Sequence, residues 1–345
     1  MMKNMRISIL GSPQAGQQQL FSLLTGIALE TIMERPLEIQ PGICEVKDGR
    51  VTKLKQLYHP KKTTYARIEY VLLPDFNLQG PARVNIFNQL KNADELCWIV
   101  RLDNAEHDLE AFIAELVVQD FMLVEKRLET ITRDKSKRFA DQQAKEKQLM
   151  ELCKKTLDQS LSLKAMNFDD DQTRLLKSYQ FLTMKPIIIV LNVPEDKIKN
   201  QTGAKLLTEK FSEPWVQLSV ELEQEISRLD ADDRLIFMKE IGIDEPAIDK
   251  MNRLAFSSLG LISFFTVGED EVRAWPIRKN SLAPEAGSAI HSDIEKGFVR
   301  AEMCKYNDLI ETGSEAKLKE IGKYYLKGKD YIVEDGDILS FRFNV

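Results

Sequence analysis

The chain has 345 residues, of which 43% are hydrophobic and 30% are charged, and its formal net charge is −6. This length suffices for two or three domains, and the modest negative charge provides no global attraction to DNA, RNA or an anionic membrane, although a local basic face stays open. The four cysteines form no Cys-x-x-Cys pair and the three histidines have no ligand spacing, so neither a metal site nor a disulfide framework is expected. Without a signal segment or a membrane-length apolar run, we expect a cytoplasmic protein.

A short buried strand at residues 5–10 leads into a loop and then a helix. The loop reads Gly11-Ser12-Pro13-Gln14-Ala15-Gly16-Gln17-Gln18. Its glycines match the P-loop pattern G-x-x-x-x-G-K-[ST], in which backbone N–H groups cradle phosphate, the lysine offsets phosphate charge and the hydroxyl binds Mg²⁺. Gln17 and Gln18 occupy the lysine and hydroxyl positions, so the cradle is retained without its charge or its magnesium ligand. A tight turn without a ligand would also require the glycines.

The first 260 residues alternate strands and helices. The candidate strands are residues 7–10, 68–73, 95–100 and 186–192. The last of them is continuously apolar and rich in isoleucine, which is typical of a parallel strand buried on both faces. We therefore predict an α/β domain with a doubly wound sheet, followed by a helical segment at 226–241.

A long helical insertion separates the third and fourth of these strands. Apolar residues recur at helical spacing from Leu109 to Ile131 and from Leu149 to Leu161, with a polar stretch at 132–147 between them. Two such segments predict an antiparallel hairpin of helices that projects from the domain. Acidic residues are interspersed in the polar stretch, which favours a solvated hinge over a basic binding patch.

The sequence pattern changes after residue 260. Short runs typical of strands follow one another at 262–266, 272–275, 298–301, 331–333 and 338–341, separated by turn residues. They predict a compact α+β module of ordinary size for a small domain.

Long stretches of this module carry a family resemblance. The runs 261–266, 271–279 and 290–302 and the ending 328–345 resemble the TGS domain of YchF-type Obg-like ATPases, which are P-loop proteins of the TRAFAC class. Residues 60–62, 124–129, 182–186 and 192–196 are similar to the same family. The resemblance implies an Obg-type P-loop domain at 1–105 and 180–260, an inserted helical or coiled-coil hairpin at 106–179, and a β-grasp, ubiquitin-like TGS domain at 261–345.

The resemblance also implies a function. Proteins of this family bind ATP more readily than GTP and associate with ribosomes. Their base-reading motif N-x-x-E corresponds to Asn192-Val193-Pro194-Glu195, and Ser219 falls in their second base-side loop. An asparagine amide can both donate to and accept from a purine edge, and ligands bind at the carboxyl ends of strands in such sheets. Asn192 could instead simply cap the strand end.

The phosphate and magnesium motifs depart from the family together. Besides Gln17 and Gln18, Glu38 replaces a switch threonine, and Leu72 and Asp75 replace the Asp and Gly of D-x-x-G. These joint losses predict a site that does not hydrolyse a nucleotide, at which ATP or GTP binds weakly and Mg²⁺ is not expected. Asp75 could supply a metal ligand from a shifted position.

Basic residues of the C-terminal module are candidate RNA contacts because they neighbour aromatic residues. They are Arg273, Arg278, Lys279, Lys296 and Arg300. Acidic residues nearby reduce the net positive charge of this patch. The neighbouring His291 and Asp293 have no adjacent nucleophile, which favours a structural role for them.

Three functions stay open. The first is a non-hydrolysing regulatory or ribosome-associated binding module. The second is a divergent ATPase or GTPase that retains weak purine nucleotide binding through residues 192–195. The third is an RNA or ribosome adaptor that acts through the TGS domain and the hairpin. No DNA or membrane partner is expected.

Overall fold

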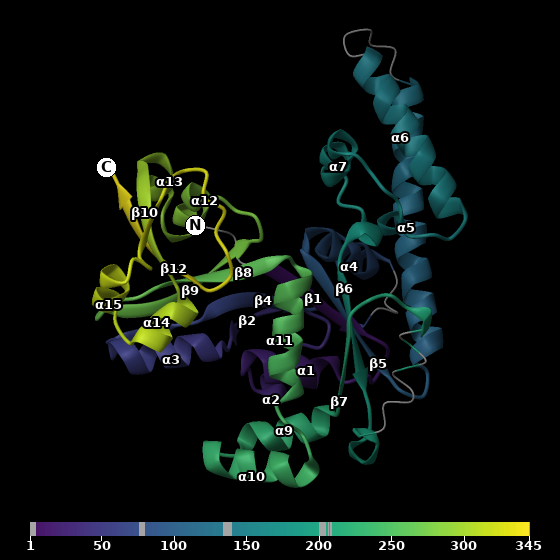
Figure 1. The fold of residues 1–345 in the computed structure, drawn as a ribbon. Coiled ribbons are helices and arrows are strands. Elements are labelled where there is room, and N and C mark those ends of the chain that lie inside the picture. Colours follow the sequence, from purple (N-terminus) through teal and green to yellow (C-terminus); the bar gives the residue numbers. More distant parts are fainter. Residues whose placement is uncertain are drawn as a thin grey trace.

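The computed structural model describes residues 5–75, 80–133, 140–199, 205, 207 and 209–344. Two six-stranded sheets lie side by side with helices around them, and two long helices project from the body (Figure 1). Within the described ranges, no helix is both long enough and apolar enough to cross a membrane.

The first sheet has the strand order β2-β4-β1-β5-β6-β7. All neighbours pair in parallel except the edge strand β2, which is antiparallel to β4. The prediction of a doubly wound α/β domain is confirmed. The strands are β1 (Met5–Gly11), β2 (Gln40–Val46), β4 (Ala66–Leu72), β5 (Glu95–Arg101), β6 (Ile187–Asn192) and β7 (Trp215–Leu218).

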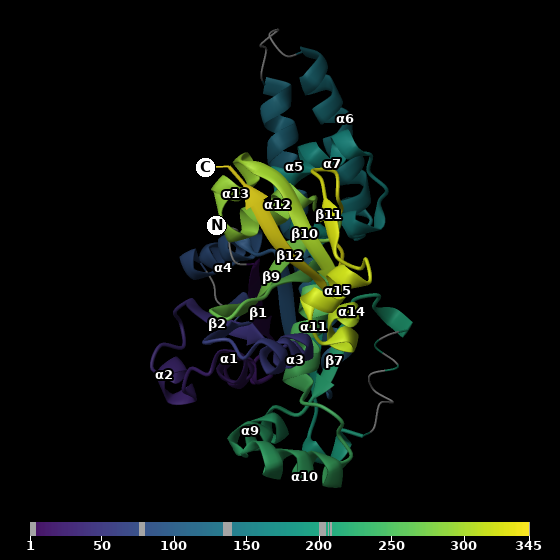
Figure 2. The same ribbon diagram turned by 60° about the vertical axis from the view of Figure 1, so that its left-hand side comes forward.

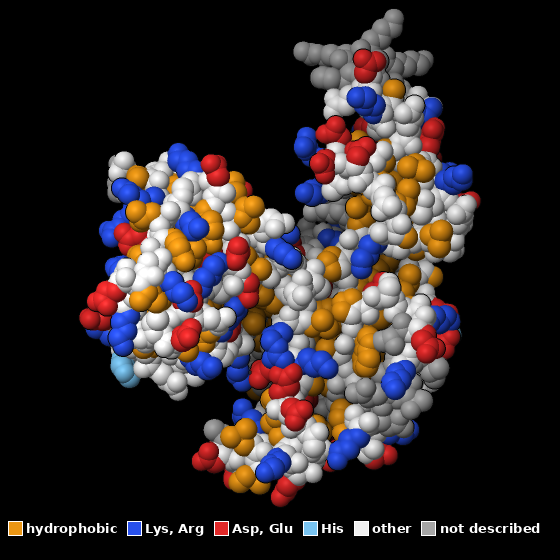
Figure 3. All heavy atoms as spheres, viewed as in Figure 1, with side chains coloured by type: hydrophobic (Ala, Val, Ile, Leu, Met, Phe, Trp, Pro, Cys, Tyr) orange, Lys and Arg blue, Asp and Glu red, His pale blue; other side chains and the backbone are white. Residues whose placement is uncertain are grey.

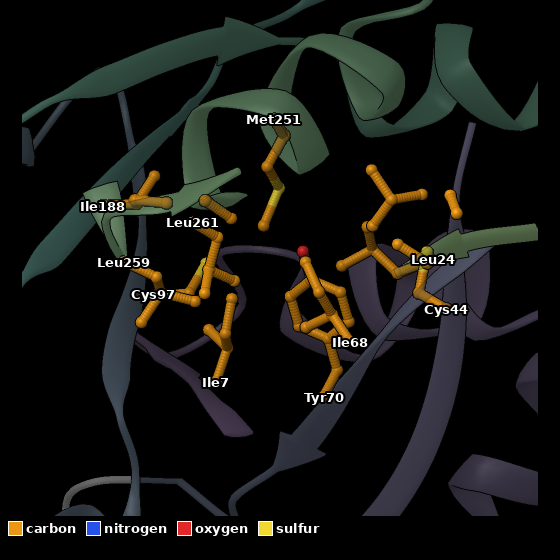
Figure 4. Packing of buried hydrophobic residues seen from close by; sticks show 14 of the residues in the cluster. Ile7, Leu24, Cys44, Ile68, Tyr70, Cys97, Ile188, Met251, Leu259 and Leu261 are labelled. Atoms are coloured by element: carbon orange, nitrogen blue, oxygen red, sulfur yellow. The ribbon is translucent and has the colours of Figure 1, made fainter. Parts of the chain in front are cut away.

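Both faces of this sheet are buried in apolar clusters, and successive side chains of a strand point to opposite faces. Ile7 and Ile9 of β1 pack in one cluster, whereas Leu10 packs in another. Figure 4 shows the first cluster, where Ile7, Ile68 and Tyr70 of the sheet lie beneath Met251. The first face is covered by α1 (Gln17–Thr25) and α11 (Ala247–Ser258), and the second by α4 (Pro81–Asn92) and α5 (Ala105–Arg133). Helix α3 (Gly49–Tyr58) packs in the first cluster against β9 (Glu271–Arg278) of the second sheet.

Strand β2 was not predicted, because Pro41 and Gly42 obscure its pattern. Its burial nevertheless alternates, with Gly42, Cys44 and Val46 buried. A Cβ atom on Gly42 would lie 2.5 Å from the Thr25 side chain, so close packing against α1 requires glycine there. The short helix α2 (Leu29–Met33) precedes this strand.

The inserted helices α5 and α6 (Ala140–Asp158) run side by side away from the sheet (Figures 1 and 2). The predicted hinge at 132–147 is too long: α5 reaches Arg133 and α6 begins at Ala140. Gln, Lys, Glu and Ala are good helix formers, so the part of this polar stretch from Ala140 to Lys147 belongs to α6, where Glu146 is buried. The insertion continues through η1 (Leu163–Ala165), α7 (Asp170–Lys177) and η2 (Leu182–Met184), and it has its own apolar core.

The predicted single helical segment at 226–241 is two helices. The first, α9 (Val220–Arg228), ends before Asp230, whose carboxylate accepts the N–H groups of Asp232 and Asp233 and so starts α10 (Ala231–Ile241). Between β6 and β7 the chain also forms η3 (Glu195–Lys197).

The second sheet has the order β11-β10-β12-β8-β9-β3. The run 331–333 forms only a single bridge, between Ile332 and Leu282, while the short edge strand β11 was missed. The elements are β3 (Lys62–Thr64), β8 (Leu261–Thr266), β9 (Glu271–Arg278), α12 (Ala283–Ile290), α13 (Ser292–Lys296), β10 (Phe298–Lys305), α14 (Tyr306–Thr312), α15 (Glu315–Glu320), β11 (Tyr325–Lys327) and β12 (Asp337–Phe343).

The two sheets are joined into one packed body. Strand β3 comes from the N-terminal part of the chain and pairs in parallel with β9. Phe265 and Val272 of the second sheet belong to the same apolar cluster as Ile7 of the first. Arg50 on α3 pairs with Asp335 at 2.6 Å. The domain boundaries at residues 105, 179 and 260 stay a prediction.

Candidate functional site

The carboxyl edge of the first sheet brings the predicted site loops together. In the parallel register, Gly11 is opposite Ile99, Arg101 is opposite Asn192, and Asn192 is opposite Leu218. The glycine loop and the segments that follow β5, β6 and β7 therefore meet at this edge, which is where ligands bind in open α/β sheets.

Packing accounts for both loop glycines. A Cβ on Gly11 would lie 2.4 Å from Ile99 Cγ2 and 2.6 Å from the Ile99 carbonyl oxygen. Gly16 has φ 99°, a left-handed conformation, and its Cβ would lie 3.0 Å from Asn192 Nδ2. The Ala15 N–H donates to the Ser12 carbonyl at 3.1 Å and closes a turn within the loop. The loop conformation is thus built into the fold.

The loop still presents hydrogen-bond donors at the start of α1. In the described part of the chain, no acceptor takes the N–H groups of Gln17, Gln18 and Gln19. The Ser12 hydroxyl is buried and has no partner among the described residues. The free N–H groups of a helix N-terminus favour an anion. Pro13 and Gln14 are exposed on the outside of the loop.

Gln17, the residue in the lysine position, is held by a hydrogen bond to Asp75. Gln17 is 2% exposed, and its Nε2 donates to Asp75 Oδ1 at 2.8 Å. A carboxylate only accepts, so the amide turns its NH₂ group to Asp75 and leaves its Oε1 buried without a partner in the described residues. We call this pair the Gln17–Asp75 latch. It carries a net negative charge where the motif has a cation.

The residues present do not fit Mg²⁺. Gln18 is half-buried and offers no hydroxyl, and Leu72 is buried in the core at 3% exposure. Glu38 is exposed and pairs with Arg35 at 3.6 Å. Asp75 binds Gln17, and the described residues contain no group of three or more His, Cys, Asp or Glu arranged to hold a metal ion.

Asn192 ties the loops of the edge together. Its Nδ2 donates to the Ala15 carbonyl at 2.9 Å, and its Oδ1 accepts the Val220 N–H at 3.1 Å. One N–H and one lone pair of the amide stay available, because an asparagine side chain has two of each. Ser219 is buried and caps α9, its hydroxyl accepting the Leu222 N–H at 3.4 Å.

A hollow of about 410 Å³ lies beside Asn192, within the range of about 300–1,000 Å³ for small-molecule sites. Its lining includes five residues that the sequence analysis named: Gln14, Asn192, Val193, Pro194 and Ser219. Glu195 is exposed on η3 and is not among the lining residues. The remaining lining residues are Arg101, Leu102, Asp103, Lys197 and Glu221.

Sequence reasoning missed the charged rim of this hollow. Arg101 is the last residue of β5, and its guanidinium pairs with Asp103 at 2.7 Å. The rule that ligands bind at strand carboxyl ends could have identified Arg101. Lys197 and Glu221 carried no comparable signal.

The candidate RNA-contact residues are dispersed. The Arg273 guanidinium lies over the Trp275 ring at 3.7 Å, and Lys296 pairs with Asp293 at 3.9 Å. Arg278 and Lys279 line a separate hollow together with Glu285 and Glu295, whereas Arg300 is exposed on β10. Blue and red side chains are interspersed over the C-terminal part in Figure 3.

His291 has a structural contact. Its Nδ1 accepts the Asp293 N–H at 3.2 Å at the start of α13. This contact stabilises the start of α13, which agrees with the structural role that we expected for these two residues.

Comparisons with known proteins agree with this architecture. The family described as YchF-GTPase_C, a protein of unknown function, matches residues 261–344. The ribosome-binding ATPase YchF of Bacillus subtilis is 34% identical and is matched over 98% of each chain, and that of Pasteurella multocida is 31% identical over 99% of each.

A solved structure matches over the whole fold. The YchF GTPase of Schizosaccharomyces pombe superposes with a TM-score of 0.85 at 26% identity, over 99% of this chain and 98% of the other. The match therefore includes the second sheet as well as the P-loop-like edge. The chain belongs to the YchF family.

Proposed function

We propose that this chain is a ribosome-associated member of the YchF family whose nucleotide site does not hydrolyse ATP or GTP. Relatives that match it over nearly their full length are named ribosome-binding ATPases, which supports the ribosome as partner. The observation that carries the loss of hydrolysis is the Gln17–Asp75 latch.

The latch opposes a triphosphate in two ways. A hydrogen bond from a charged group contributes about 1.5–3 kcal/mol, which the neutral Gln17 amide does not supply in full. The Asp75 carboxylate adds repulsion, since two like charges about 4 Å apart cost roughly 4 kcal/mol at an effective dielectric constant near 20. Mg²⁺ would offset this repulsion, but Gln18 and Leu72 occupy the positions of the hydroxyl and the aspartate that would bind it.

Phosphate release from ATP and GTP tests this proposal. With Mg²⁺ present, we expect no release above the rate without protein. A matched reaction with EDTA shows whether any release depends on a divalent ion. Turnover that requires Mg²⁺ and scales with protein concentration would contradict the proposal.

Co-sedimentation with ribosomes tests the partner. We expect association at low salt that weakens as salt rises, because phosphate contacts release counterions. Removing the C-terminal module would unfold the shared core around Phe265, so surface variants are the better probe. Lys296→Gln and Arg300→Gln test the C-terminal module, and Lys126→Gln tests the hairpin. Absence from the particle fraction at low salt would contradict this part.

A second candidate is a divergent ATPase or GTPase that retains weak purine nucleotide binding. The hollow beside Asn192 favours it, since that end of the site is preformed. This candidate predicts slow turnover that depends on Mg²⁺, so the phosphate-release assay discriminates between the two.

A further inference from the structure

We infer that the site at the carboxyl edge binds a ligand with a single phosphate, a purine nucleoside monophosphate, in preference to a di- or triphosphate. This inference rests on the proposed function, because it takes the latch to be the stable state of the phosphate end. It names the ligand class that the remaining donors and charges select.

The donors at the loop suit one phosphate group. The free N–H groups of Gln17, Gln18 and Gln19 open the nine-residue helix α1. The Ser12 hydroxyl, in the same loop, is 6% exposed and has no partner in the described part of the chain. The N–H groups can satisfy the oxygens of one phosphate, and the helix dipole favours its charge, while the unpartnered Ser12 hydroxyl is a further donor in the same loop.

The Gln17–Asp75 latch presents hydrogen-bond acceptors, whereas the loop presents donors. The Asp75 carboxylate and the buried Gln17 Oε1 are both acceptors, so they repel the acceptor-only oxygens of further phosphates. A P-loop lysine would offset that charge, but Gln17 is neutral and its NH₂ already binds Asp75. Each added phosphate therefore brings negative charge to a part of the site that offers no cation among the described residues.

The hollow and the loop are adjacent parts of one site. Gln14 belongs to the loop and lines the hollow, and Asn192 lines the hollow and binds the Ala15 carbonyl. The free N–H and lone pair of Asn192 can pair with a purine edge. The rim is electrically mixed, with Arg101 and Lys197 against Asp103 and Glu221, so it does not attract additional phosphates strongly.

Isothermal titration of the full chain with adenosine, AMP, ADP and ATP tests the inference. A second series with guanosine, GMP, GDP and GTP determines which base is preferred. The affinities of the mono-, di- and triphosphate are then compared within the series that binds more tightly. We expect the monophosphate to bind about tenfold or more tightly than the triphosphate, with the diphosphate between them. The nucleoside should bind more weakly than its monophosphate, and Mg²⁺ should tighten none of them.

Asp75→Asn isolates the latch charge, because it keeps the size of the side chain and Asp75 lies on the surface. We expect this variant to raise triphosphate affinity about threefold to tenfold and to leave monophosphate affinity within about twofold. Asp171→Asn is the matched control: it removes one charge from a side chain that is 92% exposed on α7, and it should change neither affinity.

Three outcomes would overturn the inference. They are a triphosphate that binds as tightly as the monophosphate in the unmodified chain, an unchanged ratio in Asp75→Asn, and no binding of any member of either series. None of them contradicts the proposed function, which fails only on phosphate release that depends on Mg²⁺ or on absence from ribosomes.

Discussion

The two ends of the site differ in what holds them together. At the phosphate end, the loop conformation comes from packing of Gly11 on Ile99 and from the left-handed Gly16, while Gln17, Gln18 and Leu72 occupy the positions of the motif lysine, hydroxyl and aspartate. At the base end, Asn192 serves the fold and faces the hollow at once. Packing thus dictates the backbone geometry of the loop, whereas it does not require a charged side chain at the lysine position.

The largest effect is expected for Gly11→Ala, which should destabilise the protein by about 3 kcal/mol, because the new methyl group meets the Ile99 backbone of β5. Urea unfolding measures the loss. Gly49→Ala is the control, since nothing lies within 4 Å of its Cβ and it starts α3; it should be neutral or slightly stabilising. A tolerated Gly11→Ala would mean that packing does not maintain the loop.

Asn192→Ala should destabilise the protein by about 2.5 kcal/mol, because it leaves the Ala15 carbonyl and the Val220 N–H without partners. It should also weaken ligand binding in the hollow. Asn307→Ala, at an exposed position on α14, should stay within about 0.5 kcal/mol of the parent. If both variants unfold at the same denaturant concentration, Asn192 does not join the two ends.

The phosphate end can be rebuilt by Gln17→Lys combined with Asp75→Gly. This double variant should gain roughly 2 kcal/mol in ATP affinity, about thirtyfold, because a cation replaces the latch. Gln17→Lys alone should gain less, since the new ammonium would pair with Asp75. Neither should hydrolyse ATP, because Gln18 and Leu72 are unchanged. Equal gains in calorimetric titrations of both variants would show that Asp75 is not the obstacle.

Ser219→Ala should cost about 1 kcal/mol, the usual value of a helix N-cap, and should weaken binding at the hollow that Ser219 lines. Ser314→Ala removes an equivalent cap from α15, away from the lining of the hollow. It should cost a similar amount and leave ligand affinity unchanged. If both variants lost ligand affinity equally, the loss in Ser219→Ala would reflect lower overall stability and not a contact in the hollow.

Strand β6 was predictable because it is a continuous apolar run, and β1 and β4 because their apolar residues recur between few polar ones. Strand β2 was hidden by Pro41 and Gly42, and β3 has only three residues, whose pairing with β9 depends on the tertiary fold. Likewise the sequence places Gln17 in the lysine position, but its partner Asp75 is 58 residues away and was considered as a metal ligand. Arg101 follows a predicted strand, and its register with Asn192 places it in the site.

Calorimetric titration with ATP, with and without Mg²⁺ and followed by phosphate release in the same samples, tests the central claim most directly. The latch predicts weak binding that Mg²⁺ does not strengthen, and no release of phosphate above the protein-free rate. Tight binding that requires Mg²⁺, accompanied by turnover, would contradict the account.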